Sequence, residues 1–267
     1  MQTGYLDPWR TSQAVDSQSV QVMASMIDSR AAAPEEIAAR RTYLDLLKIR
    51  AGEHALDVGC GTGAVTRDLR ERVLPGGHIV GVEPNPDLLA IAAERLPDVE
   101  FRQGDALRLP SDAEQFDVTI CITVLEHMHD AEGAIPELVR VTKPGGRIGV
   151  MCGDQESFIV NHPDRALTRR ILETFVEARF ANPWIGRQVP ALLEQHGVQQ
   201  VQVRGLPTVD RDPTRFPAQA ARLRADIALQ AGAITDAERA GWLEQLDAHP
   251  AAFLAGATYL FSWGVRV

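Results

Sequence analysis

The sequence is poor in cysteine, and its three cysteines form no recognisable pattern. Cys60, Cys121 and Cys152 are odd in number, contain no C-x-x-C pair and lack the spacing of metal ligands. We therefore predict a protein of the reducing cytoplasm with no metal site. We expect the three thiols to be small buried hydrophobic groups rather than nucleophiles, because no pattern of cationic neighbours activates them.

Positive charge and long apolar runs are also scarce. The 27 Lys and Arg residues against 36 Asp and Glu residues give a net charge of -9. This charge disfavours nucleic acids and anionic membranes as partners, because both attract a basic surface. The longest apolar runs, such as residues 118–125, are far shorter than the about 20 residues that cross a bilayer. The first ten residues also lack the basic and apolar pattern of a signal peptide.

The sequence does have the composition of an ordinary globular protein, with 45% hydrophobic and 24% charged residues. No linker or internal repeat divides it, so we predict one domain over residues 1–267. Within it we expect a helical cap over residues 1–50, a central part over 51–152 and a second half over 153–267. The second half carries a helical insertion at about 205–250, and long insertions of this kind often form lids or pocket walls.

Helix-like and strand-like stretches alternate from residue 34 onward. We expect strands at 54–58, 79–82, 99–102, 116–124, 147–151 and 198–204, and a last strand within 251–267. We expect helices at 35–49, 63–74, 86–96, 134–141, 165–181, 188–196, 213–231 and 235–248. This alternation predicts an α/β fold in which helices cover both faces of a doubly wound, mostly parallel sheet of seven strands.

A glycine-rich loop, LDVGCGTG at residues 56–63, follows the first expected strand. Such a loop lets the backbone approach a ligand closely, and the helix that follows it offers free N–H groups to an anion. The pattern Gly59-x-Gly61-x-x-Ala64 also satisfies the fingerprint of dinucleotide-binding proteins, and Glu83 lies about 20 residues further on, where an acid would bind ribose hydroxyls. The loop alone therefore leaves NAD open as a ligand.

Acidic residues follow three of the expected strands. Asp57 ends the first strand, Glu83 the second, and Asp105 follows the third. Asp57 would repel a pyrophosphate bound at the glycine loop, whereas it suits a ligand that carries an ammonium group. Because open α/β sheets bind ligands at the carboxyl ends of their strands, the three acids predict a pocket for a polar ligand that is not a polyanion.

Five motifs in chain order then carry a resemblance to a known family. They are LDVGCGTG, GVEP at 81–84, GDALRLP at 104–110, FDVTICITVLEH at 116–127 and LVRVTKPGGRI at 138–148. Together they resemble the class I S-adenosylmethionine-dependent methyltransferases of the small-molecule type, over roughly residues 36–152. The resemblance implies a Rossmann-like seven-stranded sheet with an antiparallel last strand, and S-adenosylmethionine as the cofactor.

The resemblance also implies a role for each matching position. Asp57 would hold the amino group of the cofactor, Glu83 both ribose hydroxyls, and Asp105 the adenine amino group. The remaining implied contacts come from the glycine loop and the other strand ends: Gly59, Cys60, Gly61, Gly63, Pro84, Ala106 and Ile122.

Residues on the acceptor side are weaker candidates. His127 follows the fourth strand and is our candidate general base, although a histidine there also packs against a cofactor or caps a helix. Tyr5 and Trp9 precede the first expected helix, and in similar methyltransferases this segment folds over the cofactor. The candidates for the opposite wall of the pocket are Trp184, Arg187, Phe216 and Trp242, although aromatic residues are more often part of the core.

The predicted reaction is methyl transfer to a small-molecule acceptor by in-line displacement, in which the protein aligns the reacting atoms and excludes water. An NAD-dependent oxidoreductase and a non-methylating S-adenosylmethionine-binding protein are the alternatives. A nucleic-acid methyltransferase is disfavoured, since residues 122–125 lack the Asn/Asp-Pro-Pro-aromatic signature of base amino-group methylation. The acceptor, the methylated atom and a possible homo-oligomer stay open.

Overall fold

A seven-stranded sheet forms the centre of the computed structural model, which describes residues 17–267. The strand order is β3-β2-β1-β4-β5-β7-β6. The strands are β1 His54–Val58, β2 His78–Glu83, β3 Glu100–Gln103, β4 Phe116–Ile122, β5 Thr142–Val160, β6 Val198–Asp210 and β7 Ala255–Arg266. Strands β1 to β5 pair in parallel, and β7 runs antiparallel between β5 and β6. The predicted mostly parallel sheet with an antiparallel last strand is confirmed.

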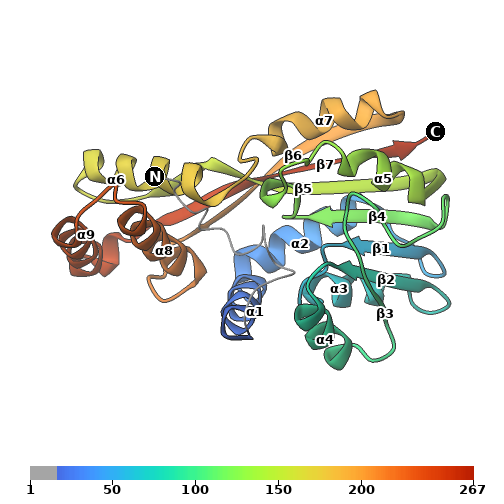
Figure 1. Cartoon of the computed structure of the whole chain (residues 1–267), viewed down its shortest axis with the longest axis horizontal. Helices are drawn as coiled ribbons and strands as arrows, with labels where there is room; N and C mark the ends of the chain where they lie inside the picture. The colour runs from blue at the N-terminus through green and yellow to red at the C-terminus, as the bar shows by residue number, and fades with distance from the viewer. Residues whose placement is uncertain (1–16) are drawn as a thin grey trace.

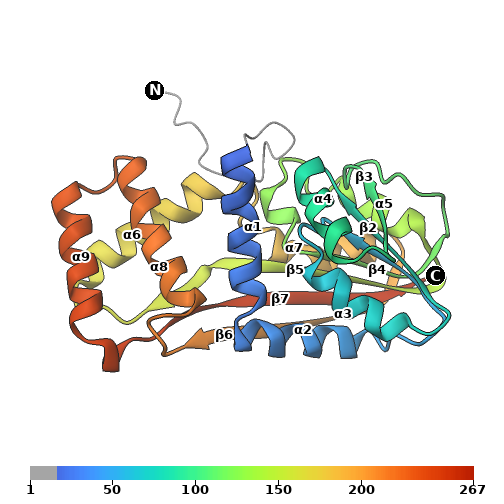
Figure 2. The same ribbon diagram turned by 90° about the horizontal axis from the view of Figure 1, so that it is seen from below.

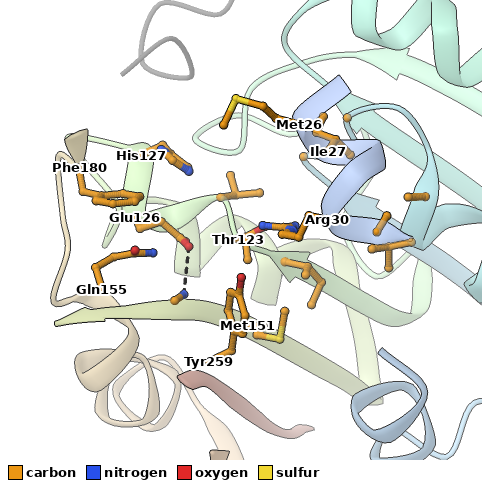
Figure 3. Close-up of a pocket in the computed structure, with 18 of the residues that line it drawn as sticks. Met26, Ile27, Arg30, Thr123, Glu126, His127, Met151, Gln155, Phe180 and Tyr259 are labelled. Atoms are coloured by element: carbon orange, nitrogen blue, oxygen red, sulfur yellow. Dashed lines mark hydrogen bonds between the residues drawn. The ribbon is translucent and has the colours of Figure 1, made fainter. Parts of the chain in front are cut away.

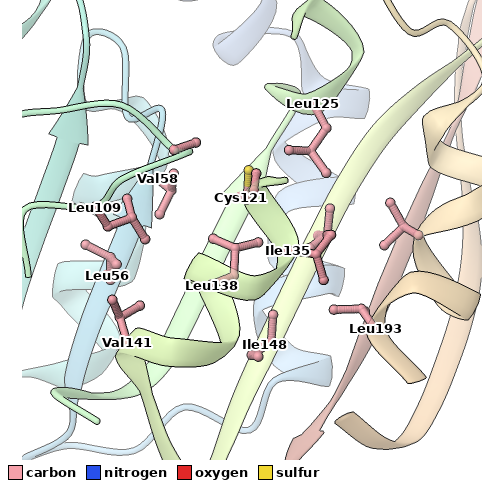
Figure 4. Close-up of a cluster of buried hydrophobic side chains, with 14 of the residues drawn as sticks. Leu56, Val58, Leu109, Cys121, Leu125, Ile135, Leu138, Val141, Ile148 and Leu193 are labelled. Carbon is pink, nitrogen blue, oxygen red and sulfur yellow. The ribbon is translucent and has the colours of Figure 1, made fainter. Parts of the chain in front are cut away.

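Helices cover both faces of the sheet (Figure 1). They are α1 Ser17–Ala31, α2 Pro34–Leu46, α3 Ala64–Val73, α4 Pro86–Arg95, α5 Ala134–Val141, α6 Arg165–Arg179, α7 Ile185–Gln195, α8 Phe216–Gln230 and α9 Asp236–Ala248, with short 3-10 helices η2 Leu125–His127 and η3 Pro250–Ala252. Helices α5 and α7 pack on one face, where Leu138 and Leu193 meet the strand residues Leu56 and Ile148 (Figure 4). Helices α2 and α3 pack on the other face.

The three cysteines are all buried and free, and Cys121 packs in the core of Figure 4. Burial raises the pKa of each thiol. They behave as small hydrophobic side chains, as the sequence indicates.

Strands β5 and β6 are much longer than we predicted. The strand expected at 147–151 spans Thr142–Val160, and the one expected at 198–204 continues to Asp210. Beyond the sheet centre both strands pair with β7, as in Val160 with Ala255 and Asp210 with Ala255. The extension of β5 is rich in polar residues, because it is buried only in part, so it lacks the apolar run that marks β4.

The extended strands carry a separate layer of helices, α6, α8 and α9, which we call the helical unit (Figures 1 and 2). Helix α8 places Ala218, Ala221, Ala225 and Ala228 on one buried side, and these small side chains allow close packing against α6. Helix α6 therefore belongs to the same layer as the two helices of the predicted insertion, and residues 205–210 of that insertion are strand.

Helix α1 lies between the helical unit and α4, as the turned view shows (Figure 2). We expected no individual helix at residues 17–31, although Val20, Met23, Ala24 and Ile27 have the i, i+3, i+4, i+7 spacing of an apolar helix face. These residues pack on Leu88 of α4. On the other side, Ser29 Oγ donates to Gln219 Oε1 of α8 at 2.9 Å, so α1 links the two parts.

Two tryptophans provide a test of the helical unit. Trp242 is 1% exposed, stacks on His162 and donates from Nε1 to Thr168 Oγ1 at 2.9 Å. Trp242→Ala should lower the free energy of unfolding by about 3–5 kcal/mol, because it leaves a large cavity. The matched change Trp184→Ala, at a side chain that is 50% exposed, should cost less than about 1 kcal/mol. Equal losses in urea denaturation would contradict this packing.

Candidate functional site

A cavity of about 850 Å³ lies at the carboxyl ends of β1, β2 and β4 and continues to the helical unit. Residues from α1, α2, the strand ends, α6 and α8 all line it, so it is built from segments distant in the sequence. Figure 3 shows the part around η2, where side chains from α1, β5 and β7 point toward a common space. A cavity of this size can hold a small-molecule ligand. The acidic strand ends face one end of the cavity.

The glycine loop forms the wall of the cavity at the end of β1. Gly59 has φ 73°, and a Cβ there would lie 2.2 Å from Val124 Cγ2, so no other residue fits. Gly59, Cys60 and Gly61 line the cavity. Gly63, with φ 81°, instead precedes α3 and faces Leu96 and Ala92, so it does not belong to the lining that the described residues form.

Asp57 is buried at the end of β1 and faces the cavity. Its Oδ2 accepts a hydrogen bond from Thr66 Oγ1 at 2.6 Å. Burial raises the pKa of Asp57 to about 6, and the hydrogen bond from Thr66 offsets only part of this effect. The side chain therefore favours a cation or several hydrogen-bond donors as its partner.

Glu83 ends β2 and is also buried. Its Oε1 accepts from the Asn85 N–H and its Oε2 from the Gly61 N–H, both at 3.1 Å. Each oxygen thus keeps acceptor capacity, because a carboxylate oxygen has two lone pairs. Burial raises the pKa of Glu83 to about 7, against the lowering effect of the two backbone donors.

The third acid, Asp105, lies in the turn after β3 and lines the same cavity with Ala106. Its Oδ1 accepts from the Leu107 N–H at 2.9 Å, which fixes the turn. Pro84 and Ile122 line the cavity too. The structure therefore brings all three strand-end acids of the sequence analysis to one side of a single cavity.

His127 lies on η2 and lines the cavity. Its ring packs against Phe180, with ring centroids 5.2 Å apart (Figure 3). The preceding residue, Glu126, is buried, and its Oε1 accepts from the Gly153 N–H at 3.0 Å. Glu126 Oε2 has no hydrogen-bond partner within residues 17–267, and the carboxylate points toward β5, away from the ring of His127 (Figure 3).

The sequence analysis did not identify Glu126. It also did not identify a cluster of three polar side chains, Arg30 of α1, Glu36 of α2 and Tyr259 of β7. Arg30 donates from Nη2 to Thr123 Oγ1 at 2.9 Å, and its Nε lies 3.9 Å from Glu36 Oε2. Tyr259 hydrogen-bonds to Glu36, and burial raises the pKa of Glu36. Glu126 was accessible to reasoning, since it is an acid directly after the apolar fourth strand. Arg30, Glu36 and Tyr259 carry no such local signal.

Two candidates for the acceptor side do not line the cavity. Trp184 is half exposed, and Arg187 stacks over its ring at 4.3 Å. Arg187 also pairs with Asp154 at 2.7 Å and Glu156 at 3.3 Å, and these carboxylates raise its pKa. Trp184 and Arg187 therefore contact each other and nearby carboxylates at the surface, near the start of α7.

The remaining acceptor-side candidates fall into three cases. Phe216 lines the cavity, whereas Trp242 belongs to the core of the helical unit. Tyr5 and Trp9 lie outside the described residues.

Residues 17–267 contain no cluster of three His, Cys, Asp or Glu side chains arranged for a metal ion. None of the helices in this part of the chain is long and apolar enough to span a bilayer.

Comparison with known proteins gives a consistent family. Residues 56–150 match the family model described as a methyltransferase domain. The chain is 32% identical over 262 residues to an uncharacterized 37.1 kDa protein in transposon TN4556 of Streptomyces fradiae, over 93% of this chain and 73% of that protein. It is 33% identical over 118 residues to a demethylmenaquinone methyltransferase of Lactobacillus johnsonii, over 42% of this chain and 48% of that one. The match thus spans about half the length of that enzyme.

Solved structures share the fold at low sequence identity. The YcgJ protein of Bacillus subtilis superposes with a TM-score of 0.58 at 17% identity, over 86% of this chain and 98% of that one. A Haemonchus contortus phosphoethanolamine N-methyltransferase in complex with S-adenosyl-L-methionine gives a TM-score of 0.61 at 17% identity, over 98% of this chain and 60% of that one.

Burial of Asp57 predicts a pH effect on stability. Its pKa in the folded chain, about 6, lies above the ordinary value of 3.8. The stability that the neutral form contributes is therefore complete below about pH 4 and is lost as the pH rises through 6. Relative to Asp57→Asn, the ligand-free protein should lose about 3 kcal/mol of unfolding free energy between pH 4 and pH 8. Urea denaturation across this range measures the difference.

The exposed carboxylate Asp45 provides the control. The same comparison with Asp45→Asn should change far less with pH, because that side chain is in water. A constant difference between the wild type and Asp57→Asn would show that Asp57 ionises normally.

Proposed function

Because the chain belongs to the class I S-adenosylmethionine-dependent methyltransferases, we propose that it methylates a small molecule bound in the same cavity as the cofactor. The observation that carries the proposal is the cavity itself. Three acidic strand ends and the glycine loop face one end, and apolar side chains of the helical unit face the other. One end thus suits a polar nucleoside and the other an apolar acceptor.

The residues at the strand ends fit the cofactor. Gly59 and Gly61 leave the space of a side chain beside the loop, and Cys60 and Pro84 continue the wall. The buried carboxylates of Asp57 and Glu83 need donors or a positive charge, which an amino group and two ribose hydroxyls would supply. Asp105 and Ala106 would hold the adenine, and the backbone near Ile122 the methionine end. When bound, S-adenosylmethionine supplies a methyl group on a positively charged sulfur.

The chain itself then has to orient the acceptor, exclude water and accept a proton where the acceptor has one. Glu126 Oε2, which has no partner in the described residues, would accept a hydrogen bond from an O–H or N–H of the acceptor. His127, which lines the same cavity, would take the proton as general base. Helix α1, linked to α4 and α8, covers the cavity and limits access of water.

Cofactor binding tests the acidic strand ends. In calorimetry the wild type should bind S-adenosylhomocysteine and should not bind NADH. Glu83→Ala should weaken S-adenosylhomocysteine binding by about a hundredfold or more, because it removes two hydrogen bonds to a charged group that contribute about 1.5–3 kcal/mol each. The control Glu100→Ala, at the amino end of β3 and outside the cavity lining, should leave the affinity unchanged. Tight NADH binding, or an unchanged Glu83→Ala variant, would refute this assignment.

Turnover tests His127. His127→Ala should lower methyl transfer to an acidic acceptor by about a hundredfold or more, since general bases contribute about 10²–10⁴ in rate. Its affinity for S-adenosylhomocysteine should change little. His54→Ala, at the amino end of β1, is the control. If His127→Ala keeps full turnover with the cofactor bound, the histidine only packs against Phe180.

A further inference from the structure

The end of the cavity against the helical unit is mostly apolar and contains two arginines. We call this end the distal chamber and define it by Phe158, Phe175, Phe180, Phe216, Leu223 and Arg224. Arg179 also lines it and is buried. Phenyl rings and a leucine form most of its wall, so the chamber suits an apolar ligand. An apolar ligand alone would not require the buried guanidinium of Arg224.

Arg224 is 6% exposed and has no carboxylate partner among residues 17–267. Its Nη1 donates to the Ala220 carbonyl at 2.9 Å, one turn earlier in α8. Its Cζ lies 3.5 Å from the ring centroid of Phe158 and 4.3 Å from that of Phe175. No carboxylate within residues 17–267 lies at ion-pair distance from it, whereas the buried Arg40 pairs with Asp68.

This environment is unfavourable for a positive charge. Burial, and to a smaller extent the nearby charge of Arg179, lower the pKa of Arg224 to about 9. The two phenyl faces attract the cation, but such contacts compensate only part of the loss of water around a buried charge. A guanidinium has five N–H donors, and one is used by Ala220. The side chain therefore has unused donors and an uncompensated charge at the wall of a cavity.

A continuous row of rings connects Arg224 with His127. The ring of Phe175 lies under the guanidinium, Phe180 meets Phe175 edge-on with centroids 5.7 Å apart, and His127 packs on Phe180 at 5.2 Å. A molecule that extends from the guanidinium to η2 therefore passes two aromatic rings.

We propose that the distal chamber binds the methyl acceptor through an acidic oxyanion group, held by Arg224, on an apolar body. The assignment rests on the proposed function, since it names the class of molecule that the same site would methylate. The anion would pair with the guanidinium fork, which matches the geometry of carboxylates and phosphates. The other end of the acceptor would then lie beside Glu126 and His127.

Three probes with the same naphthalene body test the charge requirement, and 2-naphthoate and 2-naphthamide also have the same shape. With S-adenosylhomocysteine bound, 2-naphthoate, 2-naphthyl phosphate and the neutral 2-naphthamide are titrated into the wild type by calorimetry. At least one of the two anions should bind ten times more tightly than the amide, and the tighter one shows whether the group is a carboxylate or a phosphate. Equal affinity for all three probes, or tighter binding of the amide, would overturn the proposal.

Variants assign the preference to one side chain. Arg224→Met should abolish the preference for the anion, and Arg224→Lys should retain part of it, because lysine keeps the charge without the fork. Arg222→Met is the control, since Arg222 lies two residues away and pairs with Asp247 at the surface. It should bind all probes like the wild type. A preference that survives in Arg224→Met would exclude Arg224 as the anion site.

Two further measurements separate the possible failures. Arg224→Met should melt at the same temperature as the wild type or higher, because it removes an uncompensated buried charge. A large decrease in melting temperature, together with a wild type that shows no preference for the anions, would instead identify Arg224 as a structural residue. If S-adenosylhomocysteine itself does not bind, the proposed function fails; if it binds without any anion preference, only the assignment of Arg224 fails.

Discussion

The pairing of β7 with its two neighbours determines the shape of the molecule. Along β5 the antiparallel register runs from Arg147 with Val265 at the sheet to Val160 with Ala255 at the far end, and β6 pairs with β7 over the same length. Part of this three-stranded ribbon closes the sheet, and the rest carries the helical unit (Figure 1). Because the same strands support both parts, the acidic strand ends and the distal chamber are held at a fixed separation, and the cavity between them is a direct result of strand length.

Both ends of the cavity contain buried ionisable side chains that lack an oppositely charged partner among residues 17–267. Asp57 and Glu83 are buried acids whose pKa values are raised, and Arg224 is a buried base whose pKa is lowered. In its charged form each of them costs the ligand-free fold free energy, since none has an oppositely charged partner at ion-pair distance within residues 17–267 and a buried charge without one is unfavourable. Such groups are typical of sites where a ligand completes the set of interactions. The two signs are separated within the cavity, which gives it a direction along which ligands would align.

The sequence predicts the parts of the structure that local patterns encode. The apolar run of β4, the glycine loop and the acids Asp57, Glu83 and Asp105 all follow from spacing within short segments, and the structure brings them into one cavity. The lengths of β5 and β6 do not follow. The extension of β5 is only partly buried and mostly polar. In the extension of β6 buried and exposed positions alternate, but Thr208 and Asp210 take buried positions and Val209 an exposed one, so the sequence shows no apolar alternation. Arg30, Glu36 and Arg224 reach the cavity from three helices, and only the tertiary fold brings them there. Trp184 and Arg187 show the converse, since their residue types suit a pocket but they pair with each other near the start of α7.

The position of β7 also constrains the order in which the chain acquires its structure. Strand β6 precedes β7 in the chain, yet among the strands of residues 17–267 it pairs only with β7. During synthesis β6 therefore emerges from the ribosome before the only strand that it pairs with. Until residues 255–266 follow, one edge of β5 and both edges of β6 are open to other chains. Chaperone contact is expected to matter most in this interval, after the first five strands have formed and before the ribbon is complete.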